Sequence, residues 1–213
     1  STPFVNGTRS ATQGLLDLTG NSTIDLTNVS FDSNAQPDWD GADDYIALSQ
    51  DPKWFTNEWA YELVFKSDTN NGTYQGLIWA EGAVESGYSG YQKLLALYNH
   101  QYFHYRVYSS STGGWQPATN FTPSNFTPTS YNHIVWQFYD GTTNIAINGE
   151  IVHTNSDRST YDGGSNSKLY IGTRNDLAYE LNGQIPYFKR YSRLLTASEI
   201  KSNFNAIKGR FNI

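Results

Sequence analysis

The chain has 213 residues, a formal net charge of −6, and neither cysteine nor methionine. Zero cysteines exclude a disulfide scaffold, a thiolate metal site and a cysteine nucleophile. With 14 Lys and Arg residues against 20 Asp and Glu, the charge balance argues against nucleic acid, which requires a clustered basic face. No apolar run approaches the roughly 20 residues that cross a bilayer, so we expect no membrane insertion.

Aromatic residues make up 15% of the chain and charged residues only 16%, so Ser, Thr and Asn provide most of the polar surface. So many large apolar side chains are typical of a folded protein rather than a disordered one. A neutral surface of hydroxyl and amide groups suits sugars. Because chains of this length often fold as one sandwich or barrel, we expect a single domain over residues 1–213.

Alternation of apolar and polar residues at period two predicts many short antiparallel strands. In the strand that begins at Glu58, every second residue from Trp59 to Phe65 is apolar, so Glu58 and Glu62 are expected on a solvent-facing side. The firmest hairpin is at Asn148-Gly149, because both residues tolerate the positive φ angles of a two-residue turn. In chain order, the expected strands are 23–29, 45–48, 58–66, 76–80, 93–98, 102–107, 133–139, 145–147, 150–152, 168–172 and 184–191.

One helix is expected near the C-terminus. Thr196 and Glu199 have the spacing of a capping box, which satisfies backbone donors at the start of a helix. Ile200, Phe204 and Ile207 then lie on one face of that helix, and Gly209 is expected to end it. This short amphipathic helix should cover the sandwich.

The stretch 109–130 is rich in Ser, Gly and Pro and contains an Asn-Phe-Thr-Pro sequence at both 120 and 125. Two interpretations stay open for it, a pair of tandem turns or a recognition loop.

Four segments resemble, in order and spacing, the laminin-G-like domains of the concanavalin A-like lectin/glucanase superfamily. They are Asp-Leu-Thr-Gly-Asn at 17–21, Trp-Asp-Gly-Ala-Asp-Asp-Tyr-Ile at 39–46, Asn-Gly at 148–149, and the stretch from Leu-Asn-Gly-Gln-Ile at 181–185 to residue 200. The closing segment 203–211 is similar to the ends of such domains in structural proteins of tailed phages, especially marine ones.

The resemblance implies an all-β fold, a two-sheet antiparallel jelly-roll sandwich with one short C-terminal helix. It also implies carbohydrate or cell-surface recognition. Family members open with an aliphatic-rich strand, and no such run precedes Leu15, so the chain is expected to lack that first strand.

No catalytic residues are expected. The Glu-x-Asp-x-x-Glu pattern of glucanases with this fold is missing, and Glu58 and Glu62 would lie roughly 13 Å apart along a strand, too far for glycoside hydrolysis. The segment 184–189 resembles two strands of alginate lyases, but Pro186 stands where those enzymes have histidine.

Calcium is the expected cofactor, in a structural role. Asp40, Asp43 and Asp44 offer hard oxygen ligands close together, and Asp176, Glu180 or Asn182 could approach them from near the other end of the chain. The alternative is that these aspartates only accept backbone hydrogen bonds in a turn.

A sugar site requires aromatic rings that stack on pyranose faces and polar side chains that bind the hydroxyl groups. Four tryptophans are instead expected to pack in the core, namely Trp39, Trp54, Trp59 and Trp136. The candidate carbohydrate-binding residues are Trp79, Tyr88, Tyr91, Tyr98, Tyr102 and Trp115, with Asn99, His104 and Arg106 as polar companions.

The sequence therefore predicts a non-enzymatic carbohydrate or cell-surface recognition module in a phage virion, as a part of a tail fibre, a tail or a capsid appendage. Its location would be the virion surface or the extracellular space. The expected partners are a polysaccharide or surface glycan and either other virion proteins or further copies of the chain. Two alternatives stay open: a structural virion protein without a ligand, and a polysaccharide lyase or glycoside hydrolase.

Overall fold

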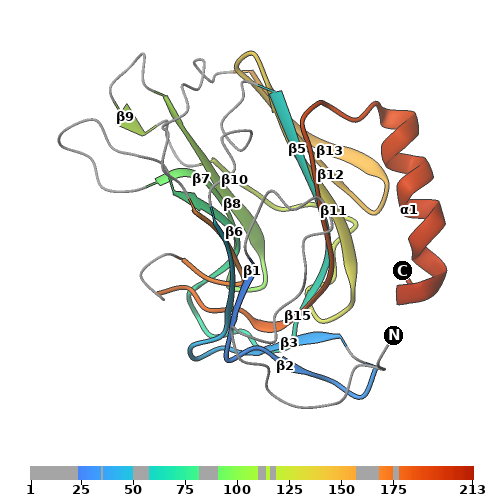
Figure 1. Cartoon of the computed structure of the whole chain (residues 1–213). Helices are drawn as coiled ribbons and strands as arrows, with labels where there is room; N and C mark the ends of the chain where they lie inside the picture. The colour runs from blue at the N-terminus through green and yellow to red at the C-terminus, as the bar shows by residue number, and fades with distance from the viewer. Residues whose placement is uncertain are drawn as a thin grey trace.

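The structure is a computed structural model that describes residues 24–34, 36–49, 58–81, 91–109, 114–115, 119–156, 168–174 and 178–213. These ranges contain fifteen strands, β1 to β15, and one helix, α1. Figure 1 shows the strands as two layers, with α1 on the outside of one of them. No helix within these ranges is long and apolar enough to cross a membrane.

The first layer, sheet A, has the strand order β1-β4-β14-β6-β7-β8-β10, and β9 pairs with β8. Its strand pairs are all antiparallel. The bounds are Ile24–Thr27 for β1, Tyr45–Ser49 for β4, Tyr74–Glu81 for β6, Tyr91–Tyr98 for β7, Tyr102–Ser109 for β8, Gly114–Trp115 for β9, Thr119–Phe121 for β10 and Lys168–Ile171 for β14.

The second layer, sheet B, has the order β13-β12-β11-β5-β15-β3-β2, and its pairs are also antiparallel. Many neighbours in both sheets are far apart in sequence, which is consistent with the predicted jelly-roll sandwich. The bounds are Ser30–Phe31 for β2, Pro37–Asp40 for β3, Glu58–Ser67 for β5, Asn132–Tyr139 for β11, Thr142–Ile147 for β12, Glu150–Asn155 for β13 and Asn182–Tyr191 for β15.

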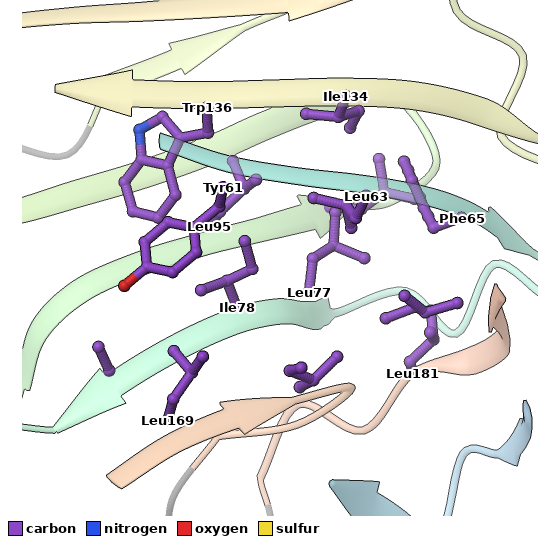
Figure 2. Packing of buried hydrophobic residues seen from close by; sticks show 14 of the residues in the cluster. Tyr61, Leu63, Phe65, Leu77, Ile78, Leu95, Ile134, Trp136, Leu169 and Leu181 are labelled. Carbon is purple, nitrogen blue, oxygen red and sulfur yellow. The ribbon is translucent and has the colours of Figure 1, made fainter. Parts of the chain in front are cut away.

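The core lies between the two sheets. Figure 2 shows Ile134, Leu63 and Trp136 of sheet B facing Leu77 and Ile78 of sheet A, and all five are fully buried. Burial of this apolar surface is the main favourable term in folding a chain without disulfides. Trp39, Trp59 and Trp136 are each at most 1% exposed, which confirms their predicted place in the core, whereas Trp54 lies outside the described residues.

The predicted strands are present within one or two residues at most ends. The Asn148-Gly149 hairpin joins β12 to β13 with φ angles of 51° and 83°, as predicted. The solvent-facing side expected for β5 is wrong, because the segment 195–203 packs over the outer face of this strand and residues 59–65 are all buried. A further difference is β10, which occupies part of the stretch 109–130 expected to lack regular structure.

Helix α1 spans Ala197–Phe211 and begins with the predicted capping box between Thr196 and Glu199. It does not end at Gly209. Asn212 closes it instead, in a left-handed conformation with a φ of 56°, which asparagine tolerates better than most residues. The helix packs on the outer face of sheet B, where Ile200 joins a buried cluster with Leu195 and three sheet residues, as expected for a covering helix.

Candidate carbohydrate-binding face

The outer face of sheet A collects many of the residues that were predicted to bind sugar. Along β7 and β8 the side chains alternate between the core and this outer face. Leu95 and Phe103 join the core cluster, whereas Tyr98, Tyr102 and His104 fall on the opposite side. The hairpin register places Tyr98 directly opposite Tyr102.

We call the group formed by Tyr74, Tyr98, Tyr102 and Tyr179 the tyrosine face. The ring centroids of Tyr74 and Tyr98 are 4.5 Å apart, and those of Tyr98 and Tyr102 are 4.9 Å apart. Tyr179 approaches Tyr74 to 5.0 Å from the segment that leads into β15. Each of the four side chains is partly exposed, so the rings form a continuous aromatic surface that solvent reaches.

Trp79 lies beneath this surface. It is only 2% exposed, because Tyr179 and Arg174 lie against it. The Arg174 guanidinium is 5.6 Å from the Trp79 ring and 4.4 Å from the Tyr179 ring, which are cation–π distances. Trp79 therefore supports the tyrosine face from below and is not itself a stacking surface.

Polar groups border the tyrosine face on its β8 side. His104 lies 4.8 Å from the Tyr74 ring, and its Nδ1 is 2.7 Å from the Asn120 side-chain oxygen. Burial, together with nearby Arg106, lowers the pKa of His104, so the imidazole is neutral at pH 7. A neutral imidazole that donates Nδ1–H to Asn120 keeps Nε2 as an acceptor for a hydroxyl group.

Tyrosine hydroxyls also gather here. Burial and the neighbouring hydroxyls of Tyr102, Tyr179 and Tyr98 raise the pKa of Tyr74. The phenol therefore stays protonated at neutral pH and can both donate and accept hydrogen bonds. The face thus combines apolar ring surfaces with neutral hydrogen-bonding groups.

The structure brings together Trp79, Tyr98, Tyr102 and His104 from the predicted set, with Arg106 next on the same face of β8. Asn99 lies in the turn between β7 and β8 with a φ of 50°. The predictions for the other three candidates stay untested, because Tyr88 and the side chains of Tyr91 and Trp115 lie outside the part of the chain that the structure describes.

Sequence reasoning missed four contributors to this site: Tyr74, Asn120, Tyr179 and Arg174. Tyr74 extends β6 two residues before its predicted start, but a bulge between Gly76 and Ile78 shifts the alternation, so the period-two pattern would have placed Tyr74 on the side opposite Trp79. Tyr179 and Arg174 lie in an irregular segment between β14 and β15, where strand alternation gives no signal.

The predicted metal ligands Asp40, Asp43 and Asp44 lie together. One carboxylate oxygen from each residue lies within 4.8 Å of those from the other two, and we call these residues the acidic group. Each carboxylate also accepts a hydrogen bond, from Ala42 N to Asp40, from Asn28 Nδ2 to Asp43 and from Asp40 N to Asp44. The turn chemistry foreseen as the alternative is therefore present, and hard oxygen donors suited to Ca²⁺ are present with it.

Asp44 is the buried member of this acidic group. Burial and the charges of Asp40 and Asp43 raise its pKa to about 6, against the opposing effect of the Asp40 backbone hydrogen bond. Glu180 is not part of the acidic group and accepts the Tyr179 N–H at 3.3 Å. Asn182 does approach this group, but donates from Nδ2 to the Asp40 carbonyl at 2.7 Å. Asp176 lies outside the described residues.

A second polar cluster lies on the outer face of sheet B, beneath α1. Glu62, expected in solvent, is fully buried there. Its carboxylate lies 2.8 Å from His133 Nε2 and accepts hydrogen bonds from Tyr191 at 2.5 Å, Asn203 at 3.2 Å and Tyr187 at 3.3 Å. We call these five residues the Glu62 network.

The Glu62 network explains why sequence reasoning placed Glu62 wrongly. Burial alone would raise the pKa of Glu62, but the hydrogen bonds from His133 and Tyr191 outweigh it and lower the pKa. The donor Asn203 belongs to α1 and is 141 residues away from Glu62 in the sequence, so no local pattern predicts this contact. Glu58, on the same strand, accepts the Leu194 N–H at 3.0 Å.

Comparisons with solved structures identify the fold. The receptor binding domain of botulinum neurotoxin C/D mosaic serotype matches 91% of the chain with a TM-score of 0.68 and 12% identity. The binding domain of botulinum neurotoxin DC in complex with SialylT matches 92% with a TM-score of 0.67 and 12% identity. A Trypanosoma rangeli sialidase in complex with the inhibitor DANA matches 86% with a TM-score of 0.65 and 14% identity.

The chain spans about half the length of the two neurotoxin domains, 49% of each, and 29% of the sialidase. No curated protein is significantly similar to it. A family model, a laminin G model described as the concanavalin A-like lectin/glucanases superfamily, matches residues 40–201. That stretch includes most of both sheets, the acidic group and the tyrosine face, and the chain accordingly belongs to the concanavalin A-like lectin/glucanases superfamily.

Proposed function

We propose that the chain is a carbohydrate-recognition module that binds a glycan across the tyrosine face. The single observation that carries this proposal is the row of partly exposed rings with centroids 4.5 to 5.0 Å apart. Aromatic rings bind the apolar faces of pyranoses, and the hydroxyl groups at the edges of those sugars need hydrogen-bonding partners. His104, Asn120 and the tyrosine hydroxyls supply such partners.

The neighbouring structures add support for this class of ligand. One neurotoxin binding domain is described in complex with SialylT, and the sialidase with the inhibitor DANA. These are statements about those proteins, and at 12% and 14% identity the likeness shows the fold alone. The proposal for this chain therefore rests on its own aromatic surface.

A binding test uses the full chain on a glycan array, followed by calorimetry with the best polysaccharide. Tyr102→Ala removes one partly exposed ring and is expected to weaken binding about tenfold, close to the upper value for one aromatic contact. Ile151→Ala is the matched control, because Ile151 is 45% exposed on sheet B and far from the face in the strand order. Unchanged affinity of Tyr102→Ala would overturn the proposal.

The same aromatic face would also suit a contact between copies of the chain, which is the structural alternative. Light scattering on the isolated chain separates the two. The recognition proposal expects a monomer that binds glycan. A dimer or larger assembly that Tyr102→Ala converts to a monomer would favour the structural function instead.

The proposal is for binding without turnover. The Glu62 carboxylate accepts hydrogen bonds within the Glu62 network, and the Glu58 carboxylate accepts the Leu194 N–H. Both carboxylates therefore stabilise the fold in place of facing a substrate. Two residues of the lyase-like segment are similarly engaged, since Gln184 donates to Asp32 and Tyr187 to Glu62. Incubation with alginate and laminarin should release neither unsaturated nor reducing ends, and such products would overturn this part.

The proposed setting is the surface of a tailed-phage particle, which rests on the similarity of residues 203–211 to phage structural proteins. An isolated recognition module of this kind should compete with intact phage for adsorption to bacterial cells. A chain that binds glycan but never reduces adsorption of tailed phages would contradict the setting and leave the binding face intact.

Calcium binding stays a prediction. If the acidic group binds Ca²⁺, addition of Ca²⁺ at pH 7.5 should raise the thermal midpoint relative to EDTA, because a ligand that binds the folded state stabilises it. Asp44→Asn should abolish the increase, and lowering the pH to 5 should weaken it, since the pKa of Asp44 is about 6. Equal midpoints in Ca²⁺ and EDTA would contradict the prediction.

A further inference from the structure

A shallow pocket lies on the outer face of sheet B, near the N-terminal end of α1. Its volume is about 320 Å³, and it is lined by Tyr139, Asp140, Thr142, Asn144 and Leu194. Tyr139 ends β11 and Thr142 begins β12, so the pocket lies at the hairpin between these strands, while Leu194 belongs to the segment that leads into α1. Figure 1 shows β11, β12 and α1 on the same side of the molecule.

Tyr139 gives the pocket its aromatic surface. It is 51% exposed, the largest value among the described large apolar side chains. Its neighbour Phe138 joins the core, so strand alternation directs Tyr139 outward. Exposing the apolar surface of a tyrosine ring to water is unfavourable, and the exposed half of the ring adds nothing to the core. Stacking on a ligand would remove that surface from water.

The walls of the pocket are held in place. Gln137 Oε1 accepts the Leu195 N–H at 3.0 Å, and Gln137 Nε2 donates to the Leu195 carbonyl at 3.2 Å. Glu58 accepts the Leu194 N–H at 3.0 Å. These bonds fix the segment that carries Leu194 against β5 and β11, so the pocket is formed before any ligand arrives, which lowers the entropic cost of binding.

The polar lining is equally ordered. Asp140 and Gly141 have φ angles of 41° and 80°, so the hairpin closes in a tight turn, and Asp140 lines the pocket together with Tyr139. Asn144 Oδ1 accepts from Thr154 at 2.7 Å, which directs the Asn144 amino group to act as a donor. The pocket therefore combines one aromatic residue with a carboxylic acid, an amide and a hydroxyl residue in its lining.

We propose that this pocket binds a single pyranose ring of a neutral sugar, as a second site on the opposite side of the sandwich from the tyrosine face. One aromatic surface with a carboxylate, an amide and a hydroxyl at its edge matches the alternating apolar face and hydroxyl rim of a pyranose. The volume is at the low end for small-molecule pockets, which fits one ring. The lining contains an acid and no cation, which disfavours an acidic sugar.

The test is a titration of the ¹⁵N-labelled full chain with glucose, galactose, N-acetylglucosamine and glucuronate, followed by amide chemical shifts. At least one neutral sugar should give saturable shifts at residues 139–144 and 194, with glucuronate weaker by several-fold. Tyr139→Ala should weaken this binding about tenfold, the upper value for one stacked ring. Tyr102→Ala, on the tyrosine face, should leave these shifts unchanged.

Asp140→Asn keeps the tight turn, since asparagine tolerates positive φ, and should remove the discrimination against glucuronate. Absence of saturable shifts at 139–144 with every sugar, or titrations unaffected by Tyr139→Ala, would overturn the proposal. Tyr102→Ala tests glycan binding at the tyrosine face and Tyr139→Ala tests sugar binding at this pocket. Failure of one proposal can therefore be distinguished from failure of the other.

Discussion

The outer faces of the two sheets are both rich in tyrosine, yet they are completed in different ways. On sheet B, helix α1 covers part of the face, and Tyr187 and Tyr191 donate to the buried Glu62. On sheet A, Tyr98 and Tyr102 contact each other and stay partly exposed. All four rings are half-buried, so the difference lies in their hydroxyl groups. Beneath α1 the phenols donate to one buried carboxylate, whereas on sheet A the rings contact one another and stay available to a ligand.

The largest expected effect comes from removing the centre of the Glu62 network. Glu62→Ala leaves the fully buried His133 and the half-buried Tyr191 without their acceptor, and should lower the free energy of unfolding by about 3–5 kcal/mol. Guanidinium denaturation followed by tryptophan fluorescence measures it. Glu150→Ala is the control, because Glu150 is exposed, and should change stability by about 0.5 kcal/mol or less. A loss below about 1 kcal/mol in Glu62→Ala would remove the distinction between the faces.

The same phenol-to-phenyl change on each face sharpens the comparison. Tyr191→Phe removes the hydroxyl that donates to Glu62 at 2.5 Å, and a hydrogen bond to a charged group is worth about 2 kcal/mol. Tyr102→Phe removes a hydroxyl from the partly exposed face and should cost about 0.5 kcal/mol or less. Equal losses from the two variants would show that the hydrogen bond to Glu62 stabilises the fold no more than a solvent-accessible hydroxyl does.

The two faces should also differ in their response to acid. The folded-state pKa of Glu62 is lowered, so its stabilising contribution is present above the unfolded pKa near 4.5 and is lost as the pH falls below that value. Glu62→Gln has no carboxylate to protonate, so its unfolding free energy should decline less steeply between pH 5 and pH 3. Denaturant unfolding across that range measures both slopes, and parallel curves would contradict the assignment.

How far the sequence predicts each face follows from how local its contacts are. The pairing of Tyr98 with Tyr102 spans a short hairpin, so alternation along two strands was sufficient to place both rings on one face. The capping box at Thr196 and the Asn148-Gly149 turn are equally local, and both were predicted correctly.

Long-range contacts were not accessible in this way. The burial of Trp79 depends on Tyr179 and Arg174, roughly one hundred residues further along the chain, and its expected exposure was wrong. Glu62 depends on His133 and on Asn203 of α1 for the same reason. Tertiary packing of this kind overrides the period-two pattern, which reports only that a strand has two sides.

The smallest expected effect tests whether α1 is an integral part of sheet B. Thr196→Ala removes the side-chain acceptor for the Glu199 N–H at the start of the helix, a loss of about 1 kcal/mol for a capping residue. If the helix and the sandwich unfold together, this loss lowers the global stability, and the slowest amide exchange in β5 accelerates in proportion. Hydrogen exchange measures both regions at once. Faster exchange confined to residues 197–211, with β5 unchanged, would mean that α1 opens independently. Helix α1 would then unfold while sheet B stays folded. The outer face of sheet B would be exposed like that of sheet A whenever the helix is open.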